Sequence, residues 1–342
     1  MNLGRVYKIA WKVLPKLPRP LVIGVSNVVA DIVYLLQGRS VKQMAKNYRR
    51  LTGQPVPGRT VRLGVRSYFR NFAQQFTMPG WSPEEIRRGC VYPGADHTEE
   101  LMESGPGPVV LALTHTGNWD LAGAWFCQNH GGILTVAEKL EPEELFQEFV
   151  AFRESLGMEI IGVGPGDHVF GQLVAQAKGR PLLVPLLADR DISGRGIEVE
   201  LGASKALVAA GPAALALALD RPLIAGTICY QKMPPEWLQK RLEGPWEPLR
   251  LLAKPFTALF GYWRIHADFT EPIPCPDSKE GESQVEAWTR AWVARVVPNL
   301  VADVSDWHMM QKVFVDDLDP ERLKRARQRA SGYDQPHGEA PQ

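Results

Sequence analysis

The chain has 342 residues, of which 45% are hydrophobic, enough for about two domains or for one large α/β domain with an extension. Its 39 basic and 38 acidic residues leave a net charge of +1, which argues against a dedicated nucleic-acid-binding protein. The four cysteines form no C-x-x-C pair, so they fit neither a zinc site nor a disulfide framework and indicate reduced thiols in a cytosol.

The first 95 residues are predicted to be helical. Arg5, Lys8, Lys12 and Lys16 recur about every four residues between apolar positions, which predicts a basic amphipathic helix that ends at the prolines of residues 18–20. This segment lacks the apolar stretch and the small-residue cleavage site of a secretory signal peptide. Further helices are expected over residues 21–36, 41–51 and 59–77, with a short one starting at Pro83.

The helix expected over residues 21–36 is the most apolar of this region. It is about 16 residues long and contains Asp31, whereas a membrane span needs about 20 apolar residues, so we expect it not to span. The basic helices over residues 5–16 and 42–50 predict a surface that rests on anionic lipid. An ordinary helical cap with solvated lysines is the alternative.

From residue 107, short apolar runs alternate with helical segments. This alternation predicts an α/β fold, a mostly parallel central sheet with helices on both faces. We expect a helical membrane-associating region over residues 1–95, an α/β core over 96–315, and a C-terminal helix with a loose tail over 316–342. The strands are expected at residues 109–115, 132–138, 158–163, 181–189, 196–201, 222–230 and 262–273, and the helices of the core at 120–128, 142–156, 169–178, 212–219 and 283–303.

Polar residues at the ends of the predicted strands are the candidates for function, because ligands of open α/β sheets bind at the carboxyl ends of the strands. His115, Glu138 and the triplet 189–191 end three of the apolar runs. Three successive charges at the end of a buried strand cost desolvation unless they are paired or used. Asp189 could supply a carboxylate to His115, and an internal salt-bridge cluster is the alternative.

His115 and Asp120 form an H-x4-D motif, with Asn118 as a candidate cap of the helix that follows. The pair suits general-base activation of a hydroxyl, since a neutral histidine accepts the proton and a carboxylate stabilises the imidazolium. His266 and Glu271 share the spacing, but His266 lies inside a predicted strand. A core histidine with a satisfied hydrogen bond is the alternative for His115.

Other motifs, present or absent, limit the ligands and the enzyme classes that fit this chain. Glu138 and Arg153 suit sugar hydroxyls or a phosphate, although a surface ion pair explains them equally well. The chain has no G-x-x-x-x-G-K-[ST] or G-x-G-x-x-G loop, which counts against NTPases and dinucleotide enzymes. It also lacks a G-x-S-x-G elbow and clustered His or Cys, which counts against serine hydrolases and zinc enzymes.

Six segments together resemble the bacterial lipid A biosynthesis acyltransferases, and among them the mycobacterial branch that acylates phosphatidylinositol mannosides. The resemblance covers about residues 1–315. The segments are H-T-G-N-W-D at 115–120, A-E-K-L at 137–140, F-R-E-S-L-G at 152–157, L-A-D-R-D at 187–191, A-G-P-A at 210–213 and D-W-H-M at 306–309.

The resemblance implies a glycerolipid-acyltransferase-like fold in an enzyme that sits peripherally on the cytoplasmic face of the plasma membrane. The implied reaction moves a long acyl chain, palmitoyl in this branch, from acyl-CoA to a mannose hydroxyl of phosphatidylinositol mono- or dimannoside. Acyl-CoA is a substrate, and no separate cofactor and no metal are implied. An apolar groove would hold the acyl tail.

The resemblance also implies roles for individual residues. His115 matches the general base and Asp120 the acidic member of the H-x4-[DE] motif. Asp189 stands where the mycobacterial enzymes carry a glutamate that pairs with the histidine. Three charged residues are implied to bind the polar head of the substrate: Glu138, Arg153 and Arg190.

We also expect backbone N–H groups near Gly117 to stabilise the oxyanion. Four apolar residues after the motif could line the acyl tunnel or pack in the core: Trp119, Leu121, Trp125 and Phe126. Three other functions remain open: a lipid A-type lauroyl or myristoyl transferase that uses acyl carrier protein, a thioesterase, and a non-catalytic lipid-binding protein.

Overall fold

The computed structural model describes residues 3–139, 142–164, 169–192, 196–233, 262–321 and 323–324. The loose tail predicted at the C-terminus lies outside these residues, as do the side chains of Arg5 and Lys8. All four cysteines are free.

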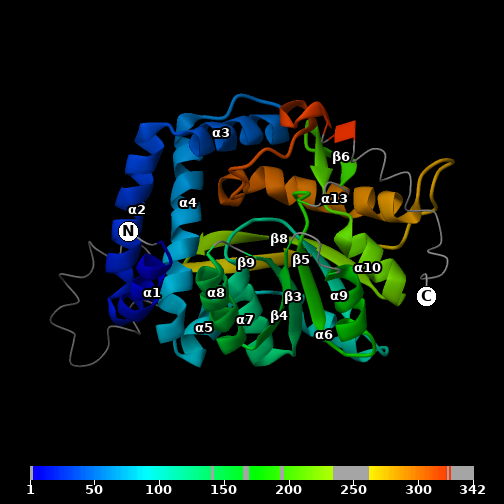
Figure 1. Ribbon diagram of the computed structural model, residues 1–342, viewed down its shortest axis with the longest axis horizontal. Helices are drawn as coiled ribbons and strands as arrows, with labels where there is room; N and C mark the ends of the chain where they lie inside the picture. Colours follow the sequence, from blue (N-terminus) through cyan, green and yellow to red (C-terminus); the bar gives the residue numbers. More distant parts are fainter. Residues whose placement is uncertain are drawn as a thin grey trace.

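A seven-stranded sheet forms the centre of the molecule, with the strand order β1-β9-β8-β2-β5-β3-β4 (Figure 1). Strands β8 and β9 pair antiparallel, and every other pair in the sheet is parallel. The predicted mostly parallel α/β sheet is therefore confirmed. The strands are β1 (Cys90–Val91), β2 (Val109–Leu113), β3 (Ile133–Glu138), β4 (Met158–Val163), β5 (Leu183–Leu187), β8 (Leu223–Lys232) and β9 (Trp263–Phe269).

The strand expected over residues 196–201 lies outside this sheet. It is β6 (Ile197–Leu201), which forms a separate antiparallel hairpin with β7 (Ser204–Val208), a strand that the sequence pattern did not predict. The short connection between β6 and β7 explains why they pair antiparallel. Gly202 adopts a φ of +68° in this loop, which is too short for the crossover that a parallel pair requires.

Helices cover both faces of the sheet, as predicted. Successive residues of β2 point to opposite sides, so Val110 and Ala112 join one apolar cluster while Leu111 and Leu113 join the other. The first cluster includes residues of α9 (Val169–Ala177), α10 (Gly211–Leu219) and α13 (Gln284–Ala302). The second includes residues of α5 (Pro83–Gly89), α6 (Ala95–Glu103), α7 (Trp119–Asn129) and α8 (Glu143–Ser155).

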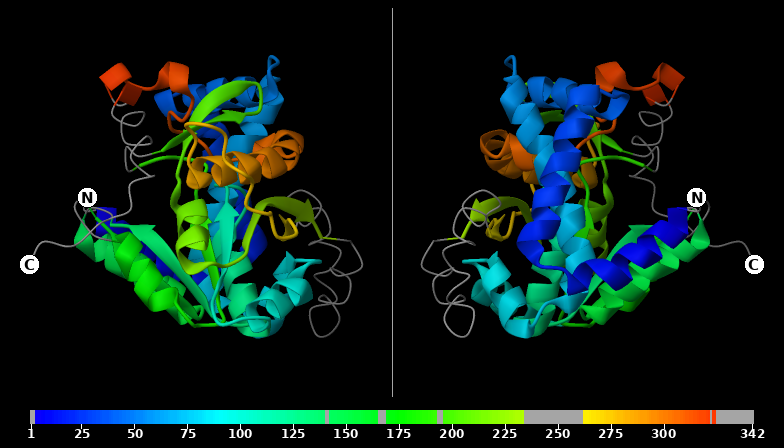
Figure 2. Two further views of the ribbon diagram at one scale, coloured as in Figure 1. Left: turned by 90° about the vertical axis from the view of Figure 1, so that its right-hand side faces the viewer. Right: turned by 90° about the vertical axis from the view of Figure 1, so that its left-hand side faces the viewer.

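Four helices precede the sheet: α1 (Leu3–Val13), α2 (Arg19–Leu36), α3 (Arg39–Thr52) and α4 (Gly58–Thr77). Figure 2 shows α1 and α2 on the outside of the molecule, facing the viewer in its right-hand view. Helix α2 packs against α4, where Asp31 accepts hydrogen bonds from Arg62 and Arg66.

Helix α2 starts at Arg19 and is long and apolar enough, by length and composition, to cross a membrane. This finding differs from the expectation that the apolar stretch is too short and too polar to span. Only 22% of the helix is buried inside the protein, so it is not a core helix.

The basic helix expected over residues 42–50 is part of α3, and half of its cations are already paired. Lys46 and Arg50 form ion pairs with Asp317, which lies in the short helix η5 (Val315–Asp317). Lys42 and Arg49 remain exposed. The positive charge that this helix offers to a lipid surface is therefore smaller than its sequence suggests.

Candidate active site

Two neighbouring strands bring His115 and Asp189 together. In the parallel pair β2–β5, Leu113 lies opposite Leu187, and His115 and Asp189 each follow two residues later. Their side chains therefore meet just beyond the carboxyl edge of the sheet, where His115 Nδ1 lies 2.5 Å from Asp189 Oδ1. Because Nδ1 faces the carboxylate, Nε2 is the ring nitrogen left for a substrate.

The carboxylate of Asp189 is fully buried and accepts hydrogen bonds at both oxygens. Besides Nδ1 at Oδ1, the backbone N–H of His115 donates to Oδ2 at 3.0 Å and the indole N–H of Trp307 donates to Oδ2 at 2.7 Å. Burial opposes ionisation, but the charge of His115 and these hydrogen bonds hold the pKa of Asp189 below its usual value. This arrangement would suit a histidine base with an ionised carboxylate that orients it.

Asp120, the other carboxylate of the H-x4-D motif, has different partners. Its Oδ1 accepts from Arg153 Nε at 2.7 Å and its Oδ2 accepts from Gln75 Nε2 at 2.6 Å. Asn118 caps α7, as predicted, by accepting from the backbone N–H of Leu121. The motif therefore places His115 and Asp120 beside one turn, while Asp189 is the carboxylate that contacts the imidazole.

The turn after His115 requires glycine at position 117. Gly117 has a φ of +57°, and a Cβ atom there would lie 2.5 Å from the carbonyl oxygen of Ile228. Its own N–H donates to the carbonyl of Asp306 at 3.1 Å. The N–H of Gly117 is consequently unavailable to an oxyanion, and the expectation of backbone donors near Gly117 stays a prediction for the other N–H groups of the turn.

Gly117→Ala is expected to lower the free energy of unfolding by about 1–3 kcal/mol, because alanine is strained at positive φ and its methyl group meets Ile228. Activity should fall with it, since the turn carries His115. Gly281→Ala is the control, because Gly281 has a φ of +76° in open space and tests the backbone term alone. Thermal unfolding and turnover of both variants measure this; equal losses in the two would contradict the steric account.

A polar chamber opens over His115. It contains buried polar atoms without a hydrogen-bond partner among the described residues: Asn71 Oδ1, Trp119 Nε1 and His308 Nδ1. Burial, followed by the charges of Arg70 and His115, lowers the pKa of His308 to about 3, so His308 is neutral near pH 7. The chamber is lined by Tyr68, Asn71, Phe72, Gln75, His115, Trp119, Phe149, Arg153, Arg190, His308, Met309, Met310 and Gln311.

The three charged residues expected to bind the polar head are all in ion pairs. Arg153 lines the chamber and pairs with Asp120, while Arg190 lines it and lies 3.3 Å from Glu138. Glu138 itself is not among the residues that line the chamber. Arg153 and Arg190 thus line the same chamber as His115, whereas Glu138 is connected to the chamber only by its ion pair with Arg190.

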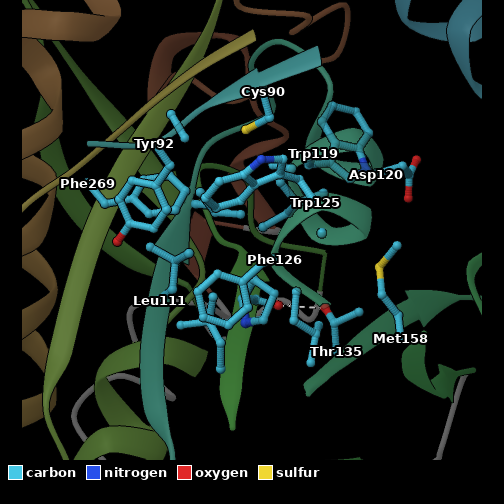
Figure 3. Close-up of a pocket in the computed structure, with 18 of the residues that line it drawn as sticks. Cys90, Tyr92, Leu111, Trp119, Asp120, Trp125, Phe126, Thr135, Met158 and Phe269 are labelled. Atoms are coloured by element: carbon cyan, nitrogen blue, oxygen red, sulfur yellow. Dashed lines mark hydrogen bonds between the residues drawn. The ribbon is translucent and has the colours of Figure 1, made fainter. Parts of the chain in front are cut away.

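An apolar pocket lies on the other side of Trp119, between α7 and the sheet (Figure 3). Trp119, Trp125 and Phe126 line it, whereas Leu121 is fully buried outside it. Trp119 and Arg153 line both this pocket and the polar chamber, so the two cavities share a wall. The further lining residues are Cys90, Tyr92, Leu111, Leu113, Asp120, Ala122, Gly123, Ile133, Thr135, Val136, Met158, Leu183, Pro185, Leu187, Ala267 and Phe269.

Sequence reasoning missed the residues that reach the site from distant parts of the chain. Gln75 comes from α4, and Trp307 and His308 follow the short helix η4 (Val304–Asp306). The D-W-H-M segment was the available signal, because it belongs to the ordered set of motifs, but nothing in its spacing indicates a contact with Asp189.

Comparisons with known proteins agree on one family. Residues 4–239 match the family model described as bacterial lipid A biosynthesis acyltransferase. The chain is 29% identical over 324 residues to the phosphatidylinositol mannoside acyltransferase of Mycolicibacterium smegmatis, with 93% of each chain covered. It is 30% identical over 328 residues to the Mycobacterium tuberculosis protein of that name, covering 94% of this chain and 92% of the relative.

Proposed function

Because this chain belongs to the bacterial lipid A biosynthesis acyltransferase family, we propose that it transfers a long acyl group, palmitoyl, from acyl-CoA to a mannose hydroxyl of a phosphatidylinositol mannoside. The relatives named for that activity support the acceptor, since they align over almost their whole length. The observation that carries the proposal is the position of His115, which opens into a polar chamber that shares Trp119 and Arg153 with an apolar pocket.

In the proposed reaction the acyl tail occupies the apolar pocket and the sugar occupies the polar chamber. His115 Nε2 takes the proton from the mannose hydroxyl as its oxygen bonds to the thioester carbonyl carbon. The carbonyl electron pair moves to oxygen, and its return breaks the C–S bond. The CoA thiolate then takes the proton from Nε2, which restores the neutral imidazole.

Trp119 is the side chain best placed to stabilise the oxyanion. It lines both cavities, so the thioester carbonyl would lie beside it where the tail meets the sugar. Its indole N–H has no hydrogen-bond partner among the described residues, and its ring lies 5.9 Å from that of His115. A preorganised donor at this point stabilises charge that develops only in the transition state.

The acceptor sugar meets both charged and neutral polar groups. Arg153 and Arg190 supply N–H donors at the chamber wall, and Asp120 holds Arg153 in place. Asn71 and His308 add buried polar atoms without partners among the described residues. Buried polar groups of this kind select ligands that carry hydroxyls, because an apolar ligand would leave them unpaired.

We further propose that α1 and α2 seat the enzyme peripherally on the cytoplasmic face of the plasma membrane. Asp31 of α2 is paired with two arginines of α4, which favours a helix that lies on the protein over one that leaves it to cross the bilayer. Lys12 and Lys16 are exposed beside this apolar face and suit anionic lipid. The exposed apolar side chains are Ile9, Val13, Leu17, Leu21, Val25, Val28, Val29, Ile32, Leu35 and Leu36.

An apolar groove between α1, α2 and α4 connects this face to the active site. Leu21, Val25 and Val29 line the groove, which shares Tyr68 and Phe72 with the polar chamber. A lipid acceptor that remains partly in the membrane can therefore present its headgroup to His115 by this route.

Ile32→Glu is expected to weaken binding to phosphatidylinositol-containing vesicles about tenfold or more, because it replaces an exposed apolar contact with a charge. Leu217→Glu is the matched control, since Leu217 is similarly exposed but lies on α10. Vesicle co-sedimentation measures both variants, and thermal unfolding checks that both are folded. Equal binding by the two variants would contradict the assignment of this face to the membrane.

A donor competition tests the proposed reaction. Purified protein is given palmitoyl-CoA or palmitoyl-acyl carrier protein with phosphatidylinositol mannoside in vesicles, and products are separated by mass spectrometry. The proposal predicts acylated glycolipid from palmitoyl-CoA. Transfer only from the carrier protein would assign the chain to the lipid A-type branch, and release of CoA without acylated glycolipid would indicate a thioesterase.

A further inference from the structure

The segment 306–308 lies across the turn that carries His115. The N–H of Gly117 donates to the carbonyl of Asp306, and the N–H of His308 donates to the carbonyl of His115 at 2.8 Å. Thr116 and Trp307 form an antiparallel bridge between the two segments. This pairing fixes the indole of Trp307 relative to the catalytic turn.

Trp307 is itself held on several sides. Its carbonyl accepts a hydrogen bond from the Tyr48 hydroxyl at 2.9 Å, and its ring stacks near that of Tyr48 and meets the ring of Phe314 edge-on. Trp307 and Asp189 are both fully buried, so water cannot replace the indole N–H at Asp189 Oδ2. The donor is therefore in place before a substrate binds.

We infer that Trp307 is a positioning residue, whose indole N–H fixes the carboxylate of Asp189 so that Oδ1 stays on His115 Nδ1 while Nε2 faces the acceptor. An aspartate carboxylate can turn about its Cβ–Cγ bond unless both oxygens are held. Without Trp307, both oxygens would be held by His115 alone, Oδ1 by its ring and Oδ2 by its backbone N–H. The indole adds a donor from a different segment, whose position does not depend on the rotation of the His115 side chain. The inference rests on the proposed function, because it assigns His115 as the base.

The charged and titratable groups around the His115–Asp189 pair have contacts of their own that do not involve the indole N–H of Trp307. Arg190 faces Glu138, and Arg153 is paired with Asp120. His308 is neutral near pH 7, and the buried Asp306 accepts from Ser67 and from the N–H of Tyr230. Arg70, which stacks on Trp263 and Tyr230, is a further buried cation nearby. None of these contacts is removed when the indole N–H of Trp307 is lost.

The test compares Trp307→Phe with Trp292→Phe. Trp292 is also fully buried, but its N–H has no partner among the described residues, so the control loses similar volume without losing a hydrogen bond. Trp307→Phe is expected to lower kcat about 10- to 100-fold with little change in KM, the effect of one charge-assisted hydrogen bond. The acid limb of kcat/KM should move to higher pH, because a carboxylate that loses a donor leaves the pair with a higher proton affinity.

Two further variants separate the loss of the indole N–H from a general disturbance of the fold. Incorporation of β-(3-benzothienyl)alanine at position 307 keeps the bicyclic shape but removes the N–H, and should reproduce the Trp307→Phe profile even where phenylalanine disturbs folding. In an Asp189→Asn background, Trp307→Phe should cost much less, because the two residues act through one interaction. Full additivity with Asp189→Asn, or a Trp307→Phe profile like that of Trp292→Phe, would overturn the inference.

A readout without turnover separates this inference from the proposed function. The titration of the His115 ring, followed by NMR, should shift upward in Trp307→Phe and stay at the wild-type position in Trp292→Phe. If the wild-type protein forms no acylated glycolipid while the ring titration shifts as stated, the proposed function fails and the positioning role stands. If wild-type transfer is present and the titration does not move, the positioning role fails alone.

Discussion

His115→Gln is expected to lower acyl transfer on the order of 10³- to 10⁴-fold. Glutamine can still donate to the buried carboxylate of Asp189, so the pair keeps its contact and the fold survives. What the variant lacks is a group that can take the proton of the mannose hydroxyl at neutral pH. Single-turnover measurements with saturating acyl donor report the loss in the chemical step.

The chain supplies a matched control in His266→Gln. His266 precedes Glu271 with the same spacing as the H-x4-D motif, but it lies inside β9, opposite Cys229 and Val91. Its substitution should leave turnover within about twofold of wild type, as expected for a group without a catalytic role. A similar loss in both variants would show that the effect of His115→Gln comes from altered structure rather than from a missing base.

Asp189→Asn is expected to cost about 10³- to 10⁴-fold, by a different route. Trp307 and the backbone of His115 continue to donate to the carbonyl oxygen of asparagine, which turns its amide N–H₂ toward Nδ1. Nδ1 must then accept, so the ring proton moves to Nε2 and His115 can no longer accept from a substrate. Activity assays show the loss, and ¹⁵N NMR of the imidazole shows the change of tautomer.

Asp120→Asn separates the two carboxylates of the site. It breaks a buried ion pair and leaves Arg153 without its carboxylate, so thermal stability should fall while the tautomer of His115 stays unchanged. Asp189 also makes the stability of the protein depend on pH in the acid range. Because its folded pKa lies below the unfolded value of 3.8, its contribution to stability is present above that pH and is lost as pH falls through the folded value. A tautomer change in Asp120→Asn would contradict this division of roles.

Much of the sheet could be predicted because its strands are short apolar runs, three of which end in polar residues at the carboxyl end. His115 and Asp189 were both placed at such ends, and a parallel sheet gathers its carboxyl ends on one edge. That β2 and β5 are neighbours could not be read in the same way, since the order of strands depends on which helices pack on which face. The H-x4-D spacing consequently left Asp120 and Asp189 as rival partners of the histidine.

The rest of the site depends on contacts between segments far apart in the chain. Gln75 meets Asp120 because α4 packs beside the site, and Trp307 meets Asp189 because segment 306–308 pairs with the turn at Gly117. Neither contact has a local signature in composition or periodicity. The charges of α3 show the converse, because Lys46 and Arg50 look free in the sequence but meet Asp317 in the fold.

The most direct test is product analysis by mass spectrometry of the purified wild-type protein with palmitoyl-CoA and phosphatidylinositol mannoside vesicles, run beside His115→Gln. The account predicts a glycolipid heavier by one palmitoyl group, formed only when the acceptor is present and absent from the variant. Acylated product formed equally by His115→Gln, or CoA release that does not depend on the acceptor, would contradict it.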